Sequence, residues 1–224
     1  MKKSTLIVSL VILVTLTLVG LIIVRTMSGD ATALNDSFTK EFIAEEWVED
    51  EFHLFESKTG QYRMLFPDQF QMISKPPEFY GRQGDYYEHW AAQIFSDSKD
   101  GISYYLTLRF RENEVDHFKT DLNRMLDDHS FQGQYEEIKL NNKIIFFGSS
   151  HWAARETRGV INSPNKNDAN TFFGLIRDQH SNRTIKLVYT TICYKEELGC
   201  EFNSEQHFSF ALKLMKSVEF LDKQ

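Results

Sequence analysis

The clearest pattern along the chain is an apolar run near its N-terminus. Residues 5–24 carry no charge and consist mostly of Leu, Val, Ile and Thr. At about 1.5 Å of rise per residue, a helix of this length spans the roughly 30 Å core of a bilayer. Lys2 and Lys3 precede the run, and only Arg25 follows it closely. The positive-inside rule therefore predicts a single-pass, integral anchor with a cytoplasmic N-terminus and an extracytoplasmic remainder, in a periplasm or at a cell surface.

A cleaved secretory signal is the alternative interpretation of the same run. Ala31-Thr32-Ala33 has the small-x-small pattern that signal peptidase recognises, so a secreted domain released at Ala33 remains open. The run is longer than the roughly 7–15 residues of a signal h-region and ends well before this site, which favours the retained anchor. No cysteine follows the run closely, so the sequence does not predict lipoprotein anchoring.

After the anchor segment 1–25, residues 26–51 are predicted to form a short polar tether and an acidic amphipathic helix. Aromatic and aliphatic residues recur there at helical spacing between glutamates, namely Phe38, Phe42, Ile43 and Trp47 among Glu41, Glu45, Glu46 and Glu49. The apolar face of such a helix packs on its own domain or contacts a partner, and packing is the commoner case. An extracytoplasmic domain is predicted to follow over residues 52–224.

Within that domain apolar and polar residues alternate in short runs, as in strands. Gly, Asn and Asp separate these runs, which predicts hairpins with turns at those residues. The predicted hairpins pair residues 52–56 with 61–66, 88–95 with 103–110, 135–140 with 143–148, and 171–177 with 184–192. Two helices are predicted, one after a cap at Asn113 and ending near His129, the other from Asn203 or Ser204 to Val218. The predicted fold class is α+β, a transmembrane helix followed by one antiparallel-sheet domain with covering helices.

Charge and cysteine content narrow the function classes. The net charge of -7 argues against nucleic-acid binding and against docking on anionic lipid surfaces. Cys193 and Cys200 are the two cysteines of the chain. Their spacing is too wide for a Cys-x-x-Cys motif and lacks a second pair for zinc, so a disulfide closing the loop between them is predicted.

The segment Gln61-Tyr62-Arg63-Met64-Leu65-Phe66-Pro67 resembles the opening of the PsbP-like family, which typically reads Gly-aromatic-x-aliphatic-x-aromatic-Pro. The order of the later strands and helices is also similar, so that the resemblance covers residues 52–221. It implies an antiparallel sheet between helices and a module that binds or assembles without catalysis of its own.

Sequence motifs for catalysis are absent: there is no Gly-rich phosphate loop, nucleophile elbow or His-Glu-x-x-His helix. Neither a cofactor nor a metal is predicted. His89 and His151, each followed by Trp, could converge with His180 or Asp178 as metal ligands, although isolated histidines beside Trp are more often packing residues.

The best binding candidate is the aromatic loop of residues 75–87, because Tyr and Arg provide contact area at low ordering cost. Its candidate partner-binding residues are Phe79, Tyr80, Arg82, Tyr86 and Tyr87. The leading hypothesis is therefore an anchored, non-enzymatic module that binds or assembles a protein of the cell envelope. The alternative is an envelope enzyme, such as a hydrolase, with a pocket at which His89 and His151 converge.

Overall fold

The computed structural model describes residues 32–76, 79–94, 101–131, 135–153, 160–162, 168–193 and 203–222. Two short 3-10 turns open this part of the chain, η1 (Ala33–Asn35) and η2 (Thr39–Glu41). They belong to the packed fold, because Ala33 is fully buried and its amide donates to the Asp68 carbonyl.

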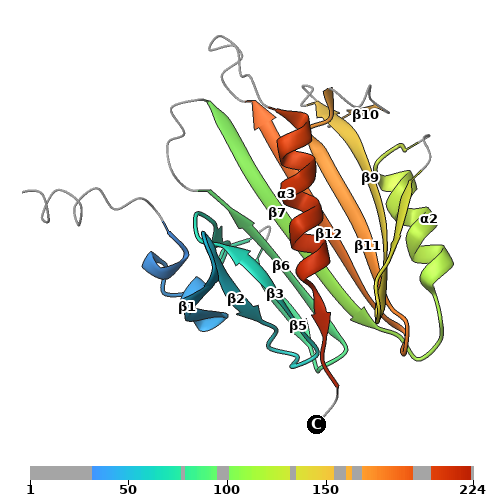
Figure 1. Cartoon of the computed structure of the whole chain (residues 1–224), viewed down its shortest axis with the longest axis horizontal. Helices are drawn as coiled ribbons and strands as arrows, with labels where there is room; N and C mark the ends of the chain where they lie inside the picture. Colours follow the sequence, from blue (N-terminus) through green and yellow to red (C-terminus); the bar gives the residue numbers. More distant parts are fainter. Residues whose placement is uncertain are drawn as a thin grey trace, which may run out of the picture.

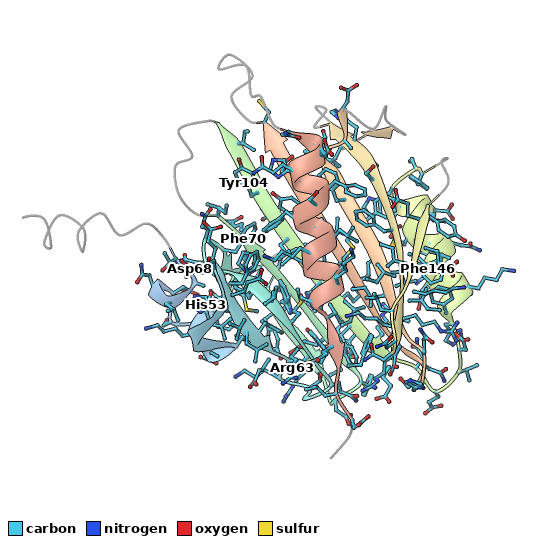
Figure 2. All side chains as sticks on the ribbon, viewed as in Figure 1. His53, Arg63, Asp68, Phe70, Tyr104 and Phe146 are labelled. Atoms are coloured by element: carbon cyan, nitrogen blue, oxygen red, sulfur yellow. The ribbon has the colours of Figure 1, made fainter. Side chains whose placement is uncertain are left out.

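Four antiparallel strands form a small sheet in the order β1-β2-β3-β13. Their bounds are β1 (Ile43–Glu49), β2 (Phe52–Glu56), β3 (Tyr62–Pro67) and β13 (Glu219–Phe220). Buried within it, the His53 ring contacts Asp68 just after β3, with Nε2 2.8 Å from a carboxylate oxygen, as Figure 2 shows. This contact joins β2 to the turn that leaves β3.

The second sheet is larger and antiparallel throughout, in the order β10-β9-β11-β12-β7-β6-β4. β5 and β8 are added at its two sides, pairing β6 and β9. The bounds are β4 (Gln71–Met72), β5 (Gly81–Gln83), β6 (Tyr87–Gln93), β7 (Ile102–Glu112), β8 (Glu136–Lys139), β9 (Lys143–Ala153), β10 (Val160–Asn162), β11 (Thr171–Asp178) and β12 (Arg183–Cys193).

Helices cover opposite faces of the large sheet. Along β9 and β11 the side chains alternate, so Phe147 and Phe172 join one buried cluster and Phe146 and Phe173 the other. The first face packs against helix α3 (Ser204–Ser217), which crosses it beside the small sheet (Figure 1). The opposite face packs against helix α2 (Phe118–Asp128).

The chemistry at its two ends explains where α3 begins and stops. The Asn203 side chain accepts hydrogen bonds from the amides of Glu205 and Gln206 at 3.0 and 3.1 Å, as an N-cap should. At the other end Lys143, buried on β9, donates to the Lys216 carbonyl at 2.6 Å and to the carbonyl of Val218. An ammonium there satisfies carbonyls that have no partner within the helix.

The predicted fold class is wrong in the proportion of strand to helix and in the elements that it places first. Strands dominate the described residues, and two sheets take the place of one. Within the same described ranges no helix is long and apolar enough to cross a membrane. The predicted anchor at residues 5–24 lies outside those ranges.

The predicted acidic helix is also wrong, because its residues form η2 and β1. β1 pairs with β2 through a shifted register, with Ile43 opposite Phe55 and Trp47 opposite His53. Phe42 and Ile43 are buried in the main core. The pairing of β1 with β2 contains two register shifts, which allow apolar residues at near-helical spacing to occur in an edge strand. The helical periodicity of the sequence was therefore outweighed by pairing between strands.

The four predicted hairpins are confirmed by the pairings of β2 with β3, β6 with β7, β8 with β9, and β11 with β12. Asn203 is confirmed as a helix cap. The cap predicted at Asn113 is wrong, since α2 begins at Phe118, where an Asp116 oxygen accepts the backbone N–H at 2.9 Å.

Candidate binding surface

α2 covers only part of its face of the large sheet. Its buried residues, Leu122 and Met125, pack against Phe146 of β9 and against Phe173 and Leu175 of β11. Figure 2 labels Phe146 on the side of the sheet where α2 lies. β6, β7 and β12 continue the same face beyond the helix, and Arg109 of β7 is exposed there. We call the outward side of β6, β7 and β12 the open face.

Strand register fixes which side chains share the open face. His89, Arg109 and Lys186 lie directly opposite one another across β6, β7 and β12. In the neighbouring row Tyr87 lies opposite Arg111, whose guanidinium stands 5.8 Å from the centre of the Tyr87 ring. These side chains therefore form one contiguous group, although they come from three separate parts of the sequence.

The charge of this region has the opposite sign to that of the whole chain. Two adjoining hollows share part of their lining here. Among the described residues that line them, four cations (Arg109, Arg111 and Lys186 of the sheet and Arg124 of α2) outnumber two carboxylates (Asp121 and Asp128). The Lys186 ammonium is 2.8 Å from Asp128. In a chain of net charge -7, this makes the open face an attractive surface for anions.

The larger hollow has a volume of about 410 Å³, within the range of ligand sites. It lies between the end of α2 and strands β6, β7 and β12, with Ala91, Thr107 and Val188 among the residues that line it. A wider hollow of about 790 Å³ lies by the β2–β3 turn and is lined by Glu56, Asp85 and Asp222 as well as Arg63. Its carboxylates match the overall charge of the chain, so it does not share the distinctive sign of the open face.

His129, directly after α2, is one of the residues that line the 410 Å³ hollow. Its ring stacks on Phe173 at 4.1 Å with an interplanar angle of 5°. Phe173 lies over Gly148, where an added Cβ would come within 2.7 Å of the ring. Burial and the nearby Lys186 charge lower the pKa of His129 to about 4, against an opposing effect of Asp128. At neutral pH this ring is therefore uncharged, with one N–H donor and one acceptor.

The aromatic loop contributes some of its predicted residues to the open face. The Phe79 ring is 43 % exposed and meets the His89 ring edge-on at 6.1 Å. Tyr87 lies on the open face beside Arg111, and Tyr86 is exposed at the end of β6. Burial and the Arg109 charge lower the pKa of His89, which fits the cationic character of its surroundings.

Two of the loop residues turn elsewhere. The Tyr80 hydroxyl donates to the buried Glu88 carboxylate at 2.9 Å, and its ring packs on Phe42 at 4.9 Å. Arg82 donates to the carbonyl of Lys58. Tyr80 is therefore part of the core packing, and Arg82 braces β5 against the β2–β3 turn.

The structure does not bring His89 and His151 together. His151 lies on β9, which is separated from β6 by β11, β12 and β7, about 19 Å at ordinary strand spacing. His151 Nδ1 lies 2.7 Å from the Asp168 carbonyl, and Asp178 binds Arg183. No group of three metal-binding side chains occurs among the residues that the structure describes. Cys193 ends β12, but Cys200 lies outside the described ranges, so the disulfide stays a prediction.

Comparison with known proteins places the chain in a family. Residues 29–219 match the family model described as "Putative lipoprotein YvcA". The chain belongs to this family. A relative of the same description, from Bacillus subtilis (strain 168), is 21 % identical over 196 residues, which cover 84 % of this chain and 76 % of the relative. No solved structure matches the chain significantly. The PsbP-like resemblance is not named by these matches and stays a prediction.

Proposed function

We propose that this chain is a membrane-associated, extracytoplasmic binding module and that the open face is its binding surface. The observation that supports this most is the incomplete cover of the large sheet. α2 packs on β9 and β11, and the strands beyond it, β6, β7 and β12, gather Arg109, Arg111 and Lys186 in an acidic chain. Exposed Phe79 and the half-buried Tyr87 border this charge and add apolar contact area.

The proposed location rests on the family and on the N-terminal sequence. The Bacillus relative carries the description "Putative lipoprotein YvcA", which supports a location in the cell envelope. In this chain the cysteines are Cys193 and Cys200, far from the N-terminus, so we propose attachment through the apolar residues 5–24. Retention of this segment fits the fold, because cleavage at Ala33 would disturb a buried residue that is hydrogen-bonded to Asp68.

Membrane attachment predicts a fractionation result. The full chain should stay in the membrane pellet after alkaline carbonate washing, whereas a variant lacking residues 1–25 should be in the soluble fraction. Protease added outside intact cells or spheroplasts should digest the domain. Release of the full chain by carbonate, or its protection from external protease, would contradict this location.

Binding by the open face predicts loss of a crosslinked partner on mutation. Full-length protein is crosslinked in cells, purified and analysed by mass spectrometry. The variant Phe79→Ser, Tyr87→Ser, Arg111→Gln should capture about tenfold less crosslinked partner, or still less. The reason is that aromatic and Arg contacts commonly contribute most of the binding free energy of an interface. These side chains are not fully buried, so the domain should stay folded.

A matched control is the variant Val48→Ser, Lys139→Gln. Val48 is 52 % exposed on β1, and the Lys139 side chain is 73 % exposed on β8. It removes an apolar and a cationic side chain outside the open face, and it should capture the partner as well as the unchanged protein does. Equal capture by both variants would show that the partner binds elsewhere.

A further inference from the structure

The 410 Å³ hollow of the open face brings two cationic side chains together. Arg109 and Lys186 lie directly opposite on β7 and β12. Like charges in this relation destabilise a sheet. Asp128 lies 2.8 Å from Lys186, but no carboxylate pairs with Arg109 among the described residues. An anion between the two cations would remove this repulsion.

A second, independent feature of the same hollow is a buried polar group without a partner. His129 is only 7 % exposed, and within the described part of the chain neither of its ring nitrogens has a hydrogen-bond partner. A buried polar group left in this state costs free energy. His129 lines the hollow, so a ligand that displaces its neighbours slightly on binding would meet an N–H that needs an acceptor. The stacking on Phe173 already holds the ring in place.

We propose that this hollow binds the phosphate group of an organic phosphate ester, a step that rests on the proposed function of the open face. Arg109, Lys186 and His129 line it from three different elements, β7, β12 and the end of α2, and in the proposed complex the His129 N–H donates to the ligand. A tetrahedral phosphate has oxygens for donors arriving from several directions, whereas a planar carboxylate suits a single guanidinium fork. The organic part of the ester lies along Ala91, Thr107 and Val188.

The test measures thermal unfolding of the full chain in a non-ionic detergent, with inorganic phosphate, glycerol 3-phosphate or chloride at matched ionic strength. The phosphate compounds should raise the melting temperature above that in chloride, since a ligand of the folded state stabilises it. His129→Phe keeps the ring stack but has no N–H. This variant should be at least as stable without ligand and should bind about tenfold or more weakly, as expected for loss of a hydrogen bond to a charged group.

Further variants distinguish binding in this hollow from nonspecific attraction of anions to the cationic surface. Arg109→Gln should weaken binding like His129→Phe, and Asp128→Asn should tighten it, because the carboxylate competes for Lys186. Lys139→Gln, on the remote β8, should bind normally. Equal shifts in His129→Phe and the unchanged protein would overturn the assignment of this hollow.

Two ligand sources share this chemistry, a water-soluble phosphate ester and a lipid headgroup. Short-chain soluble phosphatidylglycerol is therefore compared with glycerol 3-phosphate, and the stronger ligand identifies the source. If neither these compounds nor inorganic phosphate shifts the melting temperature, the phosphate inference is wrong. Partner capture in cells that depends on the open face would still stand in that case, so the two failures are distinguishable.

Discussion

Replacing Arg183 with methionine is expected to lower the free energy of unfolding by about 3–5 kcal/mol, the usual cost of removing one partner of a buried ion pair. Arg183 is 7 % exposed and Asp178 only 2 %. The guanidinium donates to one Asp178 oxygen from Nε at 2.9 Å and from Nη2 at 2.5 Å. Methionine occupies similar space but leaves the carboxylate without its counter-charge.

The Asp178 carboxylate keeps two hydrogen-bond donors when Arg183 is gone, the Ser181 hydroxyl and the His180 amide. Burial alone would raise the pKa of Asp178, but hydrogen bonds from the Ser181 hydroxyl and the His180 amide, together with Arg183, outweigh it and hold the pKa below its ordinary value. The variant therefore buries a carboxylate that has lost its counter-charge. Arg183 also donates to Gln61 before β3 at 3.2 Å and to the Leu221 carbonyl after β13, so both sheets lose a shared contact.

The measurement is urea unfolding of the full chain followed by circular dichroism, in a non-ionic detergent. Arg63→Met is the matched control, because Arg63 and Glu219 form an ion pair with 44 % and 51 % of their side chains exposed. Such surface pairs contribute about 0–1 kcal/mol. The double variant Arg183→Met, Asp178→Leu should be less destabilised than the two single losses together. Equal midpoints for Arg183→Met and Arg63→Met would show that the buried pair does not stabilise the fold.

The hairpins were predictable because their signals are local. Gly60 has φ 69° in the turn between β2 and β3, and Gly101 has φ 71° before β7. Glycine adopts this left-handed conformation without steric cost, so its presence between two alternating runs predicts a turn.

The β1–β2 hairpin was missed because its turn has no such signal. Glu51 adopts φ 66° between these strands, a conformation more typical of Gly or Asn. Phe38, Phe42, Ile43 and Trp47 meanwhile fit a helical period. Only Ile43 and Trp47 of these lie in β1, whereas Phe38 and Phe42 flank η2. The register shifts of β1 depend on pairing with β2, and the sequence pattern contains no information about such bulges.

The candidate binding surface was predictable only in part. Phe79 and Tyr87 were chosen from a loop rich in aromatic residues, and both border the open face. Alternation along β7 already indicates that Arg109 and Arg111 point away from Leu108 and Phe110. That α2 does not extend over this outward side depends on where the helix packs, which is a tertiary property. His129 gains its position from stacking on Phe173, distant in sequence.

Replacing Trp90 with alanine is expected to destabilise the domain by about 3–5 kcal/mol, since a large aromatic is lost and a cavity remains. Trp90 is 1 % exposed on the inner side of β6. Its ring lies 5.0 Å from that of Phe55 and 5.9 Å from that of Phe66, and its Nε1 donates to the Tyr62 hydroxyl at 3.1 Å. These contacts join the large sheet to β2 and β3 of the small sheet.

Trp90→Phe should cost clearly less than Trp90→Ala, because it keeps much of the ring volume and loses the bond to Tyr62. Tyr86 directly precedes β6, and its side chain is 51 % exposed. Tyr86→Ala should therefore change the free energy of unfolding by about 0.5 kcal/mol or less. Unfolding is followed by circular dichroism, which does not depend on the fluorescence of Trp90. If Trp90→Ala were no more destabilising than Tyr86→Ala, the aromatic contacts between the sheets would not be a main source of stability.

The same substitution tests how far the open face depends on the core beneath it. Trp90 lies between His89 and Ala91 in β6, and these neighbours point to the opposite side, where they line the candidate hollow. Loss of the ring removes the packing that fixes β6 on its inner side. At temperatures where Trp90→Ala is still folded, we therefore expect weaker binding at the open face than for Trp90→Phe. Equal binding by these two variants would show that pairing with β4, β5 and β7 is enough to hold β6 in position.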